Sequence, residues 1–465
     1  MANPPNVREP GVREPAARSA AQPRPGTPRP GPQRGLAEVR DRVRAAATTE
    51  PGRLWLIGAV VAVLVVAFGA VTAWEVSDRS AAAGDVVSRS QPLSADAASI
   101  YRSLADADTA AASGFLAGGQ EPLDVRKRYD TDIATASRLL VKAAANTTGS
   151  AESAQQIATL NEQLPLYNGL VEQARANNRQ GFPVGGAYLR FANQKMSTSL
   201  LPAAQKLYEA ETGRLYDDYD QADTWPYAST VLGLVALGGL VWVQRRNYLR
   251  TNRVFNHGLL AATAASTVVL LWLVVGHAVA TSDLSSSRAH GQESLKVLND
   301  ARISSLQARA NENLTLVARG AVLTREGKDL YEAEFGKEMA SLSGRLAAAR
   351  SLADDDAGKT PVAKAVGDME EWQKRHTSAR RTDDSGDYDG ALTQVLGAKG
   401  STGECFDQVD KELDSAIAHE QRQFTTAASD GHGALTGLPL GAALLAVLAA
   451  AAACVGISRR LAEYR

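Results

Sequence analysis

The chain has 465 residues, of which 45% are hydrophobic, with a net charge of −1 and two cysteines. This charge balance gives no support to nucleic-acid binding. Cys405 lies in a polar segment and Cys454 in an apolar one, without the Cys or His neighbours of a metal site, so we predict no disulfide, metal or cofactor. The hydrophobic residues gather in four blocks, which indicates an integral membrane protein.

Residues 1–53 form a basic N-terminal segment. Its first 35 residues are rich in Pro, Gly and Arg and cannot build a core, so we expect them to be disordered. Residues 36–47 are compatible with a short amphipathic helix at the membrane surface. Two interpretations stay open: the segment sets the topology only, or it docks on an acidic cytoplasmic partner or anionic lipid.

Four uncharged apolar blocks follow, at residues 54–74, 226–243, 259–280 and 435–457. Each is close to the ~20 residues that cross a bilayer as a helix, and Trp or Tyr residues flank them as at membrane interfaces. A cleaved signal peptide is an alternative for the first block, but the long preceding segment argues against it. We therefore predict four transmembrane helices.

Basic residues predict the orientation of these spans. They concentrate in the N-terminal segment, in the link 244–258 and in the tail 458–465, which the positive-inside rule assigns to the cytoplasm. The expected protein is multi-pass in the plasma membrane, with both termini cytoplasmic and with residues 75–225 and 281–434 outside. The candidate cytoplasmic contact residues are Arg245, Arg246, Arg250 and Arg253.

Both outer segments show helical periodicity with Gly- and Pro-containing breaks. We expect helices at 77–117, 122–146, 151–178 and 187–224, then at 282–325, 328–353, 359–381 and 402–433, with a short helical piece within 386–396. The predicted fold is an all-α integral membrane protein with four transmembrane helices and two extracytoplasmic four-helix-bundle domains in tandem repeat. In each bundle, the first and last helices should run directly into spans.

Small residues recur every four positions in the last span, at Ala442, Ala446, Ala450 and Cys454. Such a seam lets helices approach closely. Few polar residues lie within the spans, and His277 is expected near the interface. This pattern favours a tight bundle over a transport pathway.

A turn rich in hydrogen-bonding groups joins the third and fourth helices of the first bundle. It is interpreted either as turn chemistry or as a partner-binding patch around an exposed aromatic residue. The predicted partner-binding residues are Glu172, Arg175, Asn177, Asn178, Arg179, Gln180, Phe182, Tyr188 and Arg190. Glu172, Arg175 and Arg179 share a helix face and are expected mainly as surface ion pairs.

In the second bundle, Arg309, Glu312 and Arg319 are expected as surface pairs, with a pocket between helices as the alternative. The acidic run 354–356 lacks the alternating ligands of a calcium loop and is expected as a solvated loop. No nucleophile–base pair or phosphate loop is found, so an enzyme is not predicted.

The runs YNGLVEQARANNRQGFPVGGAYLR (167–190), LQAR (306–309) and ENLTLVARG (312–320) resemble the GlnX-type four-span membrane signalling proteins of actinobacteria. Residues 386–388 resemble, more loosely, a turn in the four-helix sensor domains of chemoreceptors. The first resemblance implies an adaptor that connects an extracytoplasmic amino-acid-binding lipoprotein, reporting aspartate or glutamate, to a cytoplasmic Ser/Thr kinase.

The residues themselves indicate only a sensor-like architecture without an output domain. Two other functions stay open: a direct small-molecule receptor with its ligand between bundle helices, and an envelope scaffold. The expected partners are thus the lipoprotein, the kinase and the lipid bilayer, with no nucleic acid, and a homodimer is left open.

Overall fold

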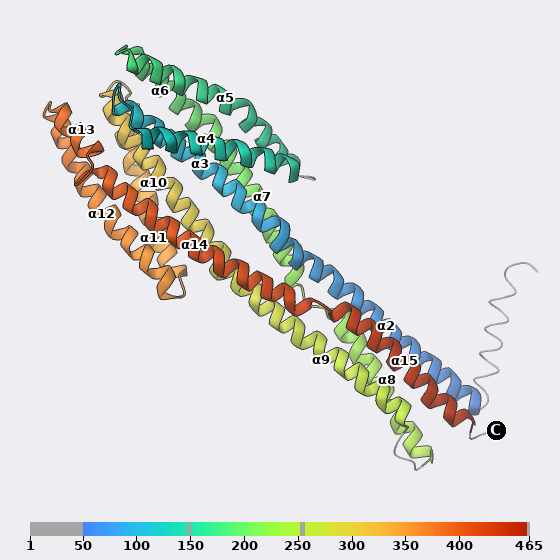
Figure 1. Ribbon diagram of the computed structural model, residues 1–465. Coiled ribbons are helices and arrows are strands. Elements are labelled where there is room, and N and C mark those ends of the chain that lie inside the picture. Colours follow the sequence, from blue (N-terminus) through green and yellow to red (C-terminus); the bar gives the residue numbers. More distant parts are fainter. Residues whose placement is uncertain (1–49, 147–149, 252–255, 463–465) are drawn as a thin grey trace, which may run out of the picture.

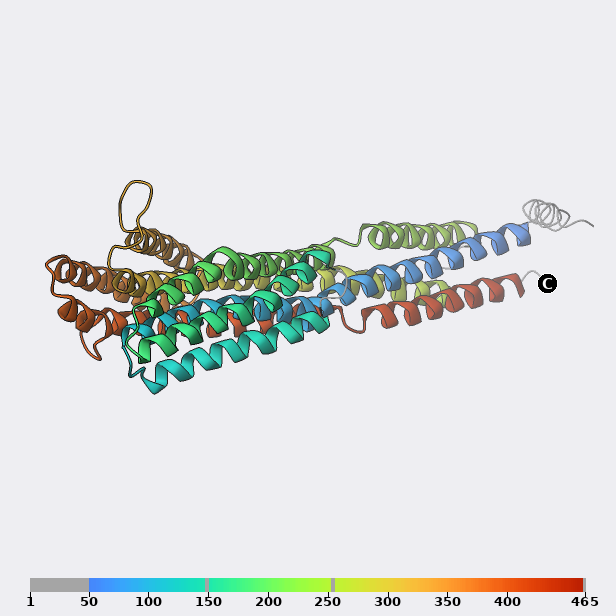
Figure 2. The ribbon, with the colours of Figure 1, turned by 90° about the horizontal axis from the view of Figure 1, so that it is seen from above.

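The structure, a computed structural model, describes residues 50–146, 150–251 and 256–462. Within these ranges the chain is helical throughout, apart from short turns and one isolated bridge between Leu323 and Asp329. The molecule is long and narrow (Figure 1). Four apolar helices form one end and the remaining helices form the other, which we call the distal domain (Figure 2).

The first half of the chain begins with one continuous helix. It comprises α2 (Glu50–Asp85), a π-helical turn η1 (Val86–Ser90) and α3 (Gln91–Leu116). Gly118 has a φ of +80°, which glycine adopts without strain, and it ends this helix. The chain then folds as α4 (Leu123–Asn146), α5 (Ala151–Arg179), α6 (Val184–Lys195), the π-helical turn η2 (Met196–Leu200), α7 (Leu201–Asp223) and α8 (Tyr227–Thr251).

The second half repeats this order. A continuous helix of α9 (His257–Ser286), the π-helical turn η3 (Ser287–Gln292) and α10 (Glu293–Ala318) runs to the far end of the distal domain. It is followed by α11 (Leu330–Leu352), α12 (Asp356–Asp384), α13 (Tyr388–Leu396), α14 (Thr402–Leu435) and α15 (Leu438–Ala462). Side chains of Asp329, Asp355, Asp387 and Ser401 accept backbone N–H groups at the starts of α11 to α14.

Two features differ from the sequence prediction. The helix expected to reach residue 325 ends at Ala318, because Arg319 and Gly320 both adopt left-handed backbone conformations. The first helix of each half does continue into a span, but the last one does not. Thr224 and Thr436 are extended, and these breaks separate α7 from α8 and α14 from α15.

The four apolar helices α2, α8, α9 and α15 are long and apolar enough to cross a membrane. They pack as a bundle in which α2 contacts α15 and α8, and α9 contacts the same two helices. Large apolar side chains point outward along them, including Val63, Leu271 and Leu444, each more than half exposed. A water-soluble protein rarely exposes so continuous an apolar surface. The protein is thus an all-α membrane protein.

The contact between α2 and α15 is unusually close. A Cβ atom at Gly69 would lie 2.1 Å from the Cβ of Ala446, so only glycine fits there. Ala442, Ala446 and Ala450 of the predicted seam are buried, but Cys454 is exposed. The seam therefore leaves the four-residue spacing near its end, where Ala453 is buried instead.

In the distal domain the two halves share one hydrophobic core. The contact runs along α3 and α10, where Thr109 Oγ1 donates to the Leu306 carbonyl at 2.9 Å and Asn313 Nδ2 donates to Ser113 Oγ at 2.7 Å. On α5, the helical stripe of Tyr167, Leu170, Val171 and Ala174 faces this core, with Leu170 half-buried and the other three fully buried. The two predicted bundles are therefore packed side by side as one body (Figure 1).

Candidate functional site

Two grooves flank the contact between α3 and α10, and each is built from both halves. The first groove, of about 850 Å³, lies between α3 and α6–α7 on one side and α10–α11 on the other. The second, of about 650 Å³, lies between α3–α4 and α10, with residues from the loop after α13 and the start of α14. In the first groove, α3 and α6–α7 of the first half face α10–α11 of the second. In the second groove, α10 and the α13–α14 region of the second half face α3–α4 of the first. The two grooves therefore occupy equivalent positions. Both fall in the size range of small-molecule sites.

The chemistry of the grooves is not equivalent. The second groove has three acidic and three basic lining residues, namely Asp124, Glu404, Asp407, Arg128, Arg309 and Lys411. The first groove has five acidic and three basic residues, so it carries two surplus negative charges when all are ionised. These residues are Asp108, Glu209, Asp300, Glu334, Glu338, Lys296, Lys337 and Arg345.

The three basic residues of the first groove are already paired. Arg345 Nη1 lies 2.6 Å and Lys296 Nζ 3.4 Å from Asp300 Oδ2. Lys337 Nζ lies 3.0 Å from Glu334 Oε2 and 4.0 Å from Glu338 Oε1. Within the described ranges, Asp108 and Glu209 have no basic partner at ion-pair distance.

Asp108 is the buried member of the unpaired acids, with 5% of its surface exposed. The Tyr167 hydroxyl donates to its Oδ1 at 3.1 Å, and Asn193 Nδ2 donates to its Oδ2 at 2.7 Å. Burial raises the pKa of Asp108 to about 6, although both hydrogen bonds act to lower it. At neutral pH this carboxylate is therefore mainly ionised, buried and held by two neutral donors.

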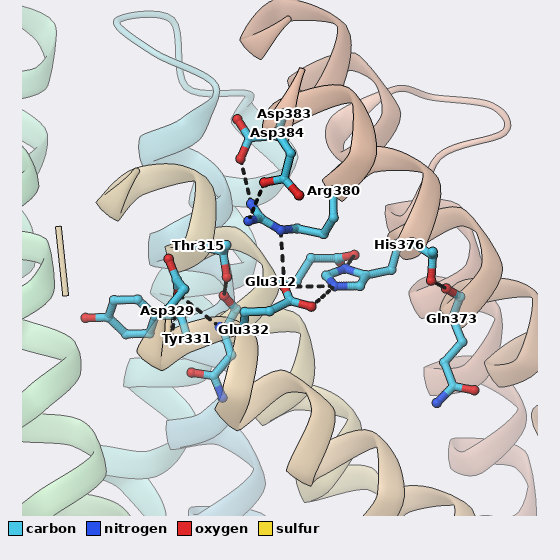
Figure 3. Close-up of polar contacts among 12 residues, drawn as sticks. Glu312, Thr315, Asp329, Tyr331, Glu332, Gln373, His376, Arg380, Asp383 and Asp384 are labelled. Atoms are coloured by element: carbon cyan, nitrogen blue, oxygen red, sulfur yellow. Dashed lines mark hydrogen bonds and ion pairs between the residues drawn. The ribbon is translucent and has the colours of Figure 1, made fainter. Parts of the chain in front are cut away.

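The second half contains a buried network of alternating charges (Figure 3). Glu312 accepts hydrogen bonds from Arg309 Nη1 at 2.5 Å, His376 Nδ1 at 2.9 Å and Trp372 Nε1 at 3.2 Å. His376 Nε2 also lies 3.1 Å from Glu332 Oε2, to which Arg380 binds in turn. The network joins α10, α11 and α12.

This network corrects the expectation of surface pairs at Arg309 and Glu312, which are 4% and 2% exposed. They face inward because α10 packs against neighbours on several sides. Arg319 lies apart, with its guanidinium over the Tyr388 ring at 3.7 Å. Burial alone would lower the pKa of His376, but the carboxylates of Glu312 and Glu332 raise it to about 9. The charges satisfy one another, so a ligand is not needed there.

The predicted partner-binding residues divide into structural and exposed groups. Arg175 is 4% exposed, pairs with Glu121 and Glu172 at 2.9 Å each, and stacks on Tyr129, so it is a core residue instead of a surface one. Asn178 Nδ2 donates to the Phe115 carbonyl at 2.8 Å and holds the end of α3.

Other members of the set face solvent at the end of the distal domain. Arg179, Gln180 and Phe182 are exposed, whereas Asn177, Tyr188 and Arg190 are half-buried. Phe182 and Phe191 are 53% and 54% exposed. The turn and the start of α6 thus combine hydrogen bonds that fix the backbone with an exposed aromatic surface.

Three of the candidate cytoplasmic contact residues, Arg245, Arg246 and Arg250, lie on α8 at the end of the span bundle farthest from the distal domain. Arg245 is exposed, and Arg246 stacks over Trp242 at 5.3 Å. Arg250 belongs to α8, and Arg253 lies outside the described residues.

Helix α7 contacts both continuous helices at their π-helical turns. Ser90 of η1 donates a hydrogen bond to Asp218, and Ser287 of η3 shares one with the Tyr219 hydroxyl at 2.7 Å. Arg288 Nη1 lies 2.6 Å from Asp220 Oδ1. One stretch of α7, just before its break at Thr224, therefore touches both halves between the first groove and the spans.

Asp108 was not singled out from the sequence, although a signal was present. It lies four residues after Leu104 and three before Ala111 on the buried face of α3. A carboxylate at an apolar helical position is a candidate for a special environment. The composition of the groove could not be found this way, because it needs α7, α10 and α11 to be placed in space.

Residues 82–220 match the family model described as the actinobacterial sensor domain. The match covers the first half of the distal domain, 139 of the 465 residues, and does not distinguish a GlnX-type protein from other sensors. No curated protein and no solved structure matches the chain. The sensor-domain match and the four apolar helices together support a multi-pass transmembrane sensor.

Proposed function

We propose that the protein is a plasma-membrane sensor whose distal domain lies outside the cell, whose termini are cytoplasmic, and which binds a small solute in the first groove. The observation that carries this proposal is the path from groove to membrane. The groove is lined by α3 and α10, and each continues as one helix through a π-helical turn into a span.

A solute in the first groove would contact α7 and α11 as well as α3 and α10. Any change in the spacing of these helices is carried by rigid elements, and helix displacements of 1–2 Å are a common means of transmission. Because α7 holds both π-helical turns, its displacement acts on α2 and α9 together. π-helical turns often mark functional positions in helices.

The orientation can be tested with single cysteines in a background that lacks Cys405 and Cys454. Lys399→Cys lies in the exposed loop before α14, and Arg459→Cys at the end of α15. A membrane-impermeant maleimide should label the first in intact cells and the second only after lysis. The reverse pattern, or labelling of both in intact cells, would refute the proposed topology.

The output is proposed to be a separate cytoplasmic protein, with a Ser/Thr kinase as the candidate that the GlnX-type resemblance implies. The exposed Arg245, at the end of the span bundle farthest from the distal domain, offers a contact. Crosslinking of a tagged copy in living cells, followed by mass spectrometry, should recover the kinase. Recovery of the protein alone, despite efficient crosslinking, would remove the basis for this partner.

A second candidate input is an extracytoplasmic amino-acid-binding lipoprotein that docks at Phe182. The exposed aromatic ring favours it, since aromatic residues often anchor protein contacts. Phe182→Ser should abolish crosslinking to the lipoprotein and change the free energy of unfolding by less than about 0.5 kcal/mol. Leu166→Ser, also at a position 53% exposed on α5, is the matched control and should leave crosslinking intact. Equal crosslinking of the lipoprotein to the wild type, to Phe182→Ser and to Leu166→Ser would exclude this docking site.

A further inference from the structure

The first groove holds a carboxylate that has no counter-charge among the residues that the structure describes. Asp108 is almost fully buried, and its two contacts are neutral donors, Tyr167 and Asn193. Burial of an ionised carboxylate is costly unless a cation or several hydrogen bonds compensate it. Glu312 in the second half shows the alternative, because this buried acid meets both Arg309 and His376.

The remaining charges of the groove do not supply the missing cation. Lys296 and Arg345 converge on Asp300, and Lys337 pairs with Glu334. If one of these basic side chains moved to Asp108, another acid would lose its ion-pair partner. The groove therefore keeps its surplus negative charge when it is empty. A positively charged ligand would complete it.

Hydrogen-bonding geometry restricts the kind of cation. Oδ1 and Oδ2 of Asp108 already accept one hydrogen bond each, from Tyr167 and Asn193. Each carboxylate oxygen has a second lone pair for one more donor. An ammonium group supplies compact donors with a full charge, whereas a metal ion would need several oxygen ligands. No cluster of acidic, His or Cys ligands suited to a metal occurs in the ranges that the structure describes.

We propose that the first groove recognises its ligand by a primary ammonium group and that Asp108 is the residue that binds this group. This inference rests on the proposed function, in which the groove is the solute site. Two classes of ligand carry such an ammonium group, free amino acids and polyamines. Glu209, the other acid of the groove without a basic partner among the described residues, offers an anion to a second ammonium group.

The test uses the purified full-length protein in lipid nanodiscs and isothermal titration calorimetry. The probes are glycine, glutamate, lysine and putrescine, and the matched control of each is its fully N-acetylated form, which for lysine and putrescine is the diacetyl derivative. At least one ammonium probe should bind, and its acetylated form should not. Binding of lysine or glycine without putrescine identifies an amino acid as the source, and binding of putrescine without glycine identifies a polyamine.

Asp108→Asn keeps the size and shape of the side chain but removes its charge, and it turns one acceptor oxygen into an amide donor, from which the Tyr167 hydroxyl can accept. It should weaken binding of the ammonium probe about 10- to 100-fold, as expected for loss of a charged hydrogen bond. Its thermal unfolding midpoint should equal or exceed that of the wild type, because an unpaired buried charge disappears. Asp407→Asn, in the second groove, should leave the affinity unchanged. A lower midpoint with unchanged affinity would show that Asp108 is only structural.

Gln307→Trp, which fills the first groove from α10, separates failure of this inference from failure of the proposed function. If acetylated and free probes bind equally and Gln307→Trp blocks both, the groove is a solute site but ammonium recognition is wrong. If no ammonium probe binds, or if binding is insensitive to Gln307→Trp, both the ammonium inference and the groove as solute site are overturned.

Discussion

Glu312→Ala should destabilise the protein by about 3–5 kcal/mol, the usual effect of removing one partner from a buried ionic network. The change would leave Arg309 and His376 positively charged at 4% and 5% exposure, with no common anion between them. It would also leave Trp372 Nε1 without its acceptor. Urea unfolding of the protein in nanodiscs, followed by circular dichroism, measures the change in the free energy of unfolding.

Two variants serve as controls for this prediction. Glu371→Ala removes a half-exposed acid that pairs with Arg375 on the same helix, α12, and should cost less than about 1 kcal/mol. A double replacement, Arg309→Met with Glu312→Leu, should be less harmful than the sum of its single changes, since it removes opposite charges together. A loss below about 1 kcal/mol for Glu312→Ala would mean that the network is not buried as described.

The network also makes the stability of the folded protein depend on pH, in a direction that follows from the pKa of His376. The pKa of His376 is raised to about 9 in the folded protein, from an ordinary value near 6.5. Protonation therefore favours the folded state: the contribution is complete below pH ~6.5 and is lost as pH rises through about 9. His376→Gln should reduce the change in the free energy of unfolding between pH ~6.5 and pH ~9. An unchanged slope would assign the dependence to other groups.

Gly69→Leu should disrupt the span bundle. A Cβ at residue 69 would lie 2.1 Å from Ala446 Cβ and 3.3 Å from the Ala442 carbonyl oxygen, so α2 and α15 must separate. Overpacking of this kind typically costs about 1–3 kcal/mol, and here it acts at the contact between the first and last spans. We expect a lower midpoint of thermal unfolding in nanodiscs and loss of disulfide crosslinking between cysteines placed at residues 58 and 457, where a Cβ at residue 58 would lie 3.5 Å from the Cβ of residue 457.

The matched control is Gly238→Leu in α8, where an added Cβ meets no atom within 4 Å. Both changes introduce the same side chain into an apolar span, so they share any effect on helix propensity or insertion. A wild-type midpoint and wild-type crosslinking for Gly69→Leu would show that the two spans are not packed closely at this point.

Much of the fold could be predicted because its determinants are local. Uncharged apolar blocks gave the four spans, and glycine turns with helical periodicity gave most of the helices. The end of α10 was missed because Arg319, not a glycine, adopts the left-handed conformation first. The break before α8 was also missed, although Pro226 lacks a backbone N–H donor and so indicated an interruption of the helix.

The site was less predictable because burial is a property of the assembled halves. Arg175, Arg309 and Glu312 have the spacing of surface ion pairs, and the sequence contains nothing that marks their faces as inward. The packing of helices within each half decides this: Arg175 meets Glu121 and Tyr129, and Glu312 meets Trp372 and His376. Phe182 behaves as the pattern suggested in being exposed, but whether a partner binds it stays a prediction.

The two grooves have equivalent positions but unequal charge, and this has an evolutionary consequence. In a symmetric homodimer every mutation enters both copies of a site at once, so neither copy can change while the other is preserved. Two halves within one chain mutate independently. Selection can then keep the unpaired carboxylate of Asp108 on one side while the other side gains Arg309 and Glu312, which stabilise the fold. Linkage in one polypeptide thus allows sensing and structural support to evolve in separate halves.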